Sequence, residues 1–131
     1  MKERESSEEF VRRQLELADE FLSDAVELLS AGRLRSAIDR AYYAMFHAAQ
    51  ALLSAKGIRA KTHVGVVRMF GKEIVEKGII DRKYGKFLSE AFDARIAGTY
   101  EVFAEPERDF AEEIVEKARM FVEKIREILE S

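Results

Sequence analysis

The sequence predicts an all-α protein: an antiparallel bundle of about five helices, with a four-helix up-down core and one short helix. The 131 residues include a single proline, and 47% are hydrophobic. The good helix formers Ala, Leu, Glu, Lys and Arg are frequent, and no stretch alternates polar and apolar residues as a strand would. This length suits one domain, so residues 1–131 are expected to fold as a single helical unit.

Two long helices are expected first, over residues 7–31 and 34–56. Gly32 and Gly57 lie where these helices should end, because glycine readily adopts the left-handed conformation that closes a helix. The second helix has apolar residues at intervals that place them within one arc of its surface. This apolar arc consists of Leu34, Ile38, Ala41, Tyr42, Met45, Ala49 and Leu52.

Three further helices are expected over residues 63–77, over residues 81–99 and from Pro106 to the C-terminus. Thr62 can cap the first of them and Gly78 can end it. Proline suits the first turn of a helix, since the N–H that it lacks is unpaired there. The last helix should pack through a stripe made of Phe110, Ile114, Ala118, Phe121, Ile125 and Leu129.

Charge is distributed unevenly, although the formal net charge is only −3. Residues 1–32 hold 4 Lys/Arg against 9 Asp/Glu, and residues 101–131 hold 5 against 10. Residues 33–72 hold 8 Lys/Arg and a single acid, Asp39. The basic middle either packs against the acidic outer helices or binds an anionic partner such as RNA.

Several classes of function are disfavoured by composition. The chain has no cysteine, which rules out disulfides, thiolate metal sites and a cysteine nucleophile. The two histidines give no metal-ligand spacing, so neither a metal nor another cofactor is expected, and no glycine-rich phosphate loop is present. Without an apolar signal segment or a membrane-spanning stretch, the expected location is the cytoplasm, with no membrane partner.

Two segments and one pair of residues resemble the HEPN domain family, in its small stand-alone archaeal and bacterial branch. The segments are DRAYYAMFHAAQALLSAKG at residues 39–57 and KTHVGVVRMF at residues 61–70, and Arg95 is followed later by Tyr100. The resemblance implies a bundle of about five helices, a homodimer and an association with nucleotides or RNA. It also implies pairing with a small nucleotidyltransferase as toxin and antitoxin.

Active ribonucleases of the HEPN family carry an arginine, four to six residues and then a histidine, and the site is completed across a dimer. At the matching position this chain has Arg95 and Tyr100 as its catalytic candidates. Tyrosine, with a reference pKa near 10, is a poor general base at neutral pH. Arg95 falls on the apolar stripe of its helix, so it either forms an ion pair or meets a phosphate.

Arg40 and His47 are the alternative catalytic pair, because six residues separate them and seven positions are nearly two helical turns. Both should lie opposite the apolar arc of their helix, on a face with small residues. That face suits a neighbouring helix, a second subunit or solvent. The pair is therefore either functional or structural, and Arg40 is also a candidate for binding a phosphate.

The candidate anion site is Lys61, Thr62 and His63, just before the expected third helix. Free N–H groups and the positive end of the helix dipole favour a nucleotide or phosphate there. The alternative is plain capping of the helix by Thr62.

Three functions remain open from the sequence. The leading hypothesis is a homodimeric HEPN-like module that binds a nucleotidyltransferase, a nucleotide or RNA and has weakened or absent catalysis. The second is an active metal-independent endoribonuclease toxin. The third is a structural helical adaptor.

Overall fold

The computed structural model describes residues 2–100 and 104–131, with side chains described for residues 7–97 and 104–131. All secondary structure in these residues is helical, which confirms the predicted fold class. The α-helices are α1 (Lys2–Ser30), α2 (Leu34–Ala55), α3 (His63–Phe70), α4 (Arg82–Tyr100) and α5 (Arg108–Glu130). A short π-helix, η1 (Gly71–Val75), continues α3.

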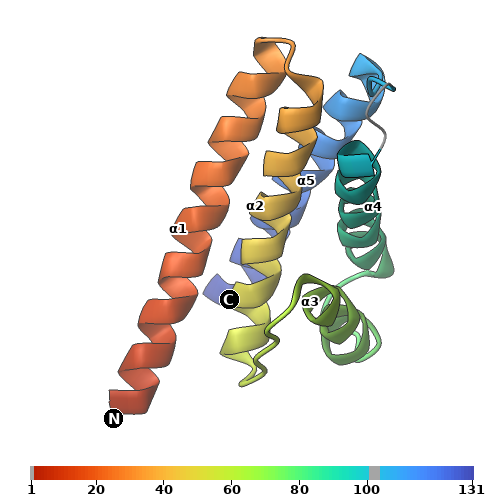
Figure 1. Cartoon of the computed structure of the whole chain (residues 1–131). Helices are drawn as coiled ribbons and strands as arrows, with labels where there is room; N and C mark the ends of the chain where they lie inside the picture. The colour runs from red at the N-terminus through yellow and green to blue at the C-terminus, as the bar shows by residue number, and fades with distance from the viewer. Residues whose placement is uncertain (1, 101–103) are drawn as a thin grey trace.

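The helices form a bundle around α2, which contacts α1, α4 and α5 (Figure 1). The hairpin of α1 and α2 has the most extensive interface in the fold. The short α3 lies across the end of the bundle near the C-terminus of α2, and α4 runs back along the other flank (Figure 1). None of the described helices is long and apolar enough to cross a bilayer.

The expected helix ends are confirmed at three glycines. Gly32, Gly57 and Gly78 have φ angles of +77°, +77° and +74°, which side chains with a Cβ rarely adopt. Each follows a helix, so the chain reverses where the sequence predicts.

Four details of the prediction are wrong. The first helix begins at Lys2 and not at residue 7. The third helix is not α-helical to residue 77, because its last turn widens into η1 at Gly71–Val75. The last helix begins at Arg108 and not at Pro106. Its N-cap is Glu107, which is extended with φ −76° and ψ 148°, so Pro106 lies before the helix. Phe110 is 42% exposed and does not join the core, whereas Phe121 and Ile125 are fully buried.

The core is built on the apolar arc of α2. Ile38, Ala41, Tyr42, Met45, Ala49 and Leu52 of that arc are buried, as predicted. Burying a side chain as large as Ile, Leu or Met stabilises a fold by about 1.5–3 kcal/mol relative to leaving it exposed. Tyr42 differs from the other residues of the arc because it carries a polar group. Its side chain is fully buried, so its hydroxyl requires a hydrogen-bond partner inside the protein.

Candidate functional site

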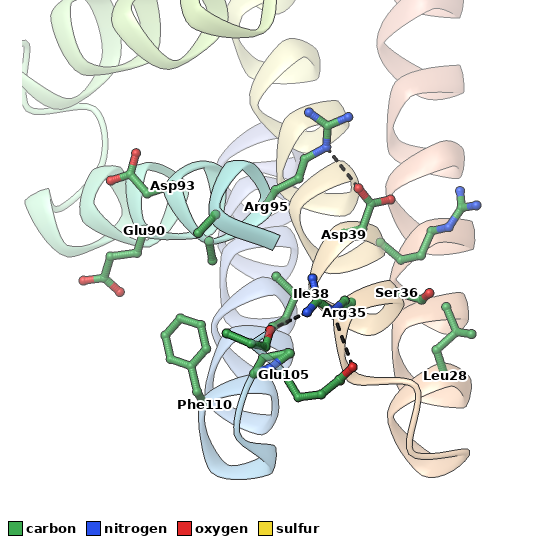
Figure 2. Close-up of a pocket in the computed structure, with 15 residues that line it drawn as sticks. Leu28, Arg35, Ser36, Ile38, Asp39, Glu90, Asp93, Arg95, Glu105 and Phe110 are labelled. Atoms are coloured by element: carbon green, nitrogen blue, oxygen red, sulfur yellow. Dashed lines mark hydrogen bonds and ion pairs between the residues drawn. The ribbon is translucent and has the colours of Figure 1, made fainter. Parts of the chain in front are cut away.

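Arg95, on α4, is held against α2 by a carboxylate and a phenol. Its Nε donates to Oδ1 of Asp39 at 3.0 Å, and its Nη2 donates to the hydroxyl of Tyr43 at 2.9 Å. Figure 2 shows Arg95 reaching from the end of α4 toward Asp39. The side chain of Arg95 remains 29% exposed. Of the two alternatives for this arginine, the structure shows the ion pair, and the side chain is only partly buried.

The same guanidinium lies near two tyrosine rings. Its central carbon is 5.0 Å from the ring centroid of Tyr43 and 5.7 Å from that of Tyr42. A cation at this distance is attracted by the π-system. The two rings and the carboxylate therefore fix the position of Arg95.

Tyr42 connects Arg95 to the first residue of α3. Its hydroxyl is 2.7 Å from Nδ1 of His63, which satisfies the polar group of an otherwise buried side chain. Burial raises the pKa of Tyr42 well above its ordinary value, so the phenol is neutral at physiological pH. Burial, and then the charge of Arg95, lowers the pKa of His63. We call the group of Asp39, Tyr42, Tyr43, His63 and Arg95 the Arg95 cluster.

Arg40 and His47 both contact α1 through Phe21. The imidazole of His47 stacks on the Phe21 ring with 5.3 Å between centroids, and the guanidinium carbon of Arg40 lies 5.4 Å from the same ring. Nδ1 of His47 is 2.6 Å from Oε1 of the buried Gln14. Since an amide oxygen only accepts, a hydrogen bond in this orientation requires the proton on Nδ1.

This arrangement gives the α2 face opposite the apolar arc a structural role. Ala44 and Ala51 of that face are fully buried, so α1 of the same chain occupies much of it. Burial, followed by the charges of His63 and Arg13, lowers the pKa of His47. The sequence did not single out Gln14 or Phe21 as partners of this histidine, because both lie on another helix.

The three residues of the candidate anion site do not act together. Thr62 caps α3, and its Oγ1 accepts from the N–H of Gly65 at 2.9 Å. Lys61 is exposed, whereas His63 turns toward the Arg95 cluster and its ring centroid lies 4.3 Å from that of Phe46. The capping alternative therefore describes Thr62, and His63 belongs with Arg95.

Tyr100 is the last residue of α4, and its side chain lies outside the described residues. The expectation that Tyr100 forms a catalytic pair with Arg95 therefore stays a prediction. Among residues whose side chains are described, no three His, Asp or Glu converge as ligands for a metal ion.

A pocket of about 800 Å³ adjoins the Arg95–Asp39 pair (Figure 2). It lies between the start of α2, the end of α4 and the start of α5, and Pro106 and Phe110 contribute apolar walls. Its charged side chains are three arginines and four acids: Arg35, Arg40, Arg95, Asp39, Glu90, Asp93 and Glu105. Several are already paired, since Glu90 accepts from Lys117 at 2.7 Å and Arg35 lies 3.7 Å from Glu105. The pocket is thus close to charge balance, and any phosphate in it must compete with carboxylates.

The described side chains offer two chemical groups. An arginine with a partly exposed side chain can bind a phosphate, and the two imidazoles with lowered pKa values are largely neutral near pH 7 and can accept a proton. The protein is thus a small helical domain with a polar site at the junction of α2, α3 and α4. An arginine near the end of α4 and a Tyr–His pair form this site.

Comparison with known families identifies this domain. The HEPN domain model matches residues 11–128, and the chain belongs to the HEPN domain family. It is 39% identical over 115 residues to the candidate toxin MJ0605 of Methanocaldococcus jannaschii, covering 88% of this chain and 85% of that protein. It is 38% identical over 130 residues to a UPF0332 protein of Thermotoga maritima, covering 99% and 96%. A UPF0332 protein of Archaeoglobus fulgidus is 36% identical over 109 residues, covering 83% and 86%.

Proposed function

We propose that this chain is an RNA-associated HEPN module of a toxin–antitoxin-type pair, with weak or absent RNA cleavage of its own. The observation that carries the proposal is the state of Arg95. The side chain of Arg95 is partly exposed, but its guanidinium already binds Asp39 and the hydroxyl of Tyr43. Five residues later the sequence has Tyr100 in place of the family's histidine.

The toxin-like role is supported by family membership and by two relatives from Methanocaldococcus jannaschii that are named as candidate toxins. The proposed partner, a small nucleotidyltransferase, follows from the family resemblance. Such a partner can hold a HEPN chain inactive by covering the surface through which it meets RNA. Co-expression with a nucleotidyltransferase encoded beside it should give a complex that elutes as one species, and two separate species would contradict the partnership.

The proposed oligomer is a homodimer. The α2 face that first suggested a second subunit is largely covered by α1, so the proposal rests on the family resemblance. Light scattering should give about twice the 15.0 kDa of one chain at micromolar concentration. A mass near 15.0 kDa would contradict the dimer.

An active metal-independent endoribonuclease is the second candidate. It is favoured by His63, whose neutral imidazole is linked through Tyr42 to the Arg95 cluster and is suited to accept a proton. His63 could then supply the general base that Tyr100 lacks. Arg95 would stabilise the charge that develops on the scissile phosphate.

One experiment separates the two candidates. Purified protein is incubated with labelled single-stranded RNA in EDTA, and binding and cleavage are followed together. The proposed function predicts binding that weakens in Arg95→Ala, with little or no cleavage. Brisk cleavage that is lost in both His63→Gln and Arg95→Ala would instead establish the active nuclease.

A further inference from the structure

The outer face of α3 and η1 carries a stripe of exposed cations. Within residues 63–72 the exposed side chains are those of Val64, Arg68 and Lys72, and Lys61 is exposed just before the helix. Positions four apart lie on one face of a helix, about 6 Å apart along its axis. The opposite face is buried, because Val66, Phe70 and Ile74 enter the core. We call Lys61, Val64, Arg68 and Lys72 the α3 stripe.

The cations of the α3 stripe differ from those of α5. Among the described residues, Lys61, Arg68 and Lys72 have no carboxylate within ion-pair distance. The cations of α5 all lie within 4 Å of at least one carboxylate: Arg108, Lys117, Arg119, Lys124 and Arg126. The cations of the α3 stripe are therefore unpaired where those of α5 are paired. Exposed cations without a carboxylate partner among the described residues also occur before α2, after α2 and at the start of α4: Arg33, Lys56, Arg59, Arg82, Lys83 and Lys86.

The carboxylate nearest to the stripe is that of Glu73, which forms its ion pair with Lys77 at 2.5 Å and not with Lys72. The hydrogen bond from Lys77 lowers the pKa of Glu73, and the charge of Lys72 adds to this effect. Glu76, the next exposed position along the chain, ends the stripe with the opposite charge. The surface is thus a short linear track and not a broad basic face.

From this arrangement we propose that the α3 stripe binds the sugar–phosphate backbone of single-stranded RNA and delivers it to the Arg95 cluster. The inference rests on the proposed RNA-associated function and adds a second contact surface to it. Spaced cations along a line suit a linear polyanion, because each can neutralise a successive stretch of phosphates. The track is continuous with the site, since His63 lies between Lys61 and Val64 and turns inward to Tyr42.

The stripe contains no aromatic residue and no group that reads base edges, apart from the phosphate-binding cations. Val64, which is 54% exposed, offers an apolar contact without sequence preference. The stripe therefore supplies affinity that is independent of sequence and dependent on salt, whereas Arg95 contacts the phosphate at the site.

The test measures how affinity depends on salt. The affinity of the full chain for a short unstructured RNA is followed by fluorescence anisotropy at increasing salt concentration. Each phosphate contact on a single strand contributes about 0.7 to the slope of log K against log salt. Arg68→Gln and Lys72→Gln should each lower that slope by about 0.7, and their combination by about 1.4.

Arg33→Gln is the matched control, because Arg33 is also exposed and also lacks an ion pair among the described residues. It precedes α2, whose 22 residues separate it by about 33 Å from the end that leads into α3. Its slope should equal that of the wild type. Equal losses in Arg33→Gln and Arg68→Gln would overturn the proposal in favour of a general charge effect.

The remaining outcomes separate this inference from the proposed function. Wild-type RNA binding that Arg95→Ala weakens but stripe variants leave unchanged would overturn the stripe and keep the function. No wild-type affinity at low salt would remove the RNA function itself. If the wild type bound no RNA and the stripe variants no longer bound a nucleotidyltransferase that the wild type binds, the surface would be a protein interface. The substitutions at Arg33, Arg68 and Lys72 are at exposed positions, and an unchanged circular dichroism spectrum verifies the folding of every variant.

Discussion

Arg95 and Asp39 are 56 residues apart in the sequence, and their ion pair at 3.0 Å fastens the end of α4 to the start of α2. The acid is the single side-chain carboxylate among residues 33–72, and the arginine stands where the HEPN resemblance places the motif arginine. The same carboxylate that positions Arg95 therefore competes with any phosphate for its charge. This competition makes Asp39 the first residue to change.

Asp39→Asn should strengthen RNA binding several-fold, because it releases the positive charge of Arg95 and keeps the shape of the side chain. The pair is partly exposed, with 29% and 38% of the two side chains accessible, so the free energy of unfolding should fall by less than about 1 kcal/mol. Anisotropy and urea denaturation measure the two effects. Asp19→Asn is the matched control. Asp19 forms an ion pair with Arg126 at 2.7 Å, and its substitution changes the net charge of the chain by the same amount as Asp39→Asn. Equal gains in both variants would contradict a specific role for Asp39.

Substitutions at Arg95 test whether its charge serves a ligand or the fold. Arg95→Leu should cost little stability, because it keeps an apolar contact with the tyrosine rings and Asp39 can turn to water. Arg95→Ala should cost more, about 1–2 kcal/mol, since it also removes that packing. Both should weaken RNA binding. Large and equal losses of stability, found by urea denaturation, would assign Arg95 a purely structural role.

Tyr100→His should raise RNA cleavage, because imidazole exchanges protons near neutral pH and a phenol does so poorly. Gel assays in EDTA compare the wild type, Tyr100→His and Tyr100→Phe. Adding Arg95→Ala to Tyr100→His should abolish the gain, which excludes a contaminating nuclease. The idea of weakened catalysis fails if the wild type cleaves briskly and Tyr100→Phe does not. If His47→Ala alone abolished cleavage, the site would lie at Arg40 and His47.

Stability should fall as the pH drops below about 7. The pKa values of His47 and His63 are lowered in the fold, first by burial and then by nearby charges. Near pH 6.5, where an exposed histidine titrates, the unfolded chain therefore binds more protons than the folded chain. The loss begins as pH falls through about 6.5 and levels off below the folded pKa values.

Urea denaturation between about pH 5.5 and pH 7.5 measures this effect. His47→Gln and His63→Gln should each flatten the dependence, and the double variant should remove most of it. A double variant with the wild-type slope would show that other groups, such as carboxylates, cause the loss.

Local periodicity explains which features the sequence predicted. The apolar arc of α2 can be predicted from the 3.6 residues per turn of a helix alone. The helix ends at Gly32 and Gly57 can be predicted from the backbone freedom of glycine. The cap at Thr62 likewise depends on residues within one turn. Phe110 shows the limit of such patterns, because it satisfies the stripe of α5 but lies 42% exposed beside the pocket.

The sequence by itself determined the helices, the basic character of residues 33–72 and the identity of the candidate residues. Tertiary structure alone decided their partners: Asp39 for Arg95, Tyr42 for His63, and Phe21 for Arg40 and His47 together. These contacts join residues on different helices, so they depend on how the helices cross and how far each is displaced along its axis. A helical pattern fixes which face of a helix a residue occupies, but the residue that faces it is fixed by the packing of the whole bundle.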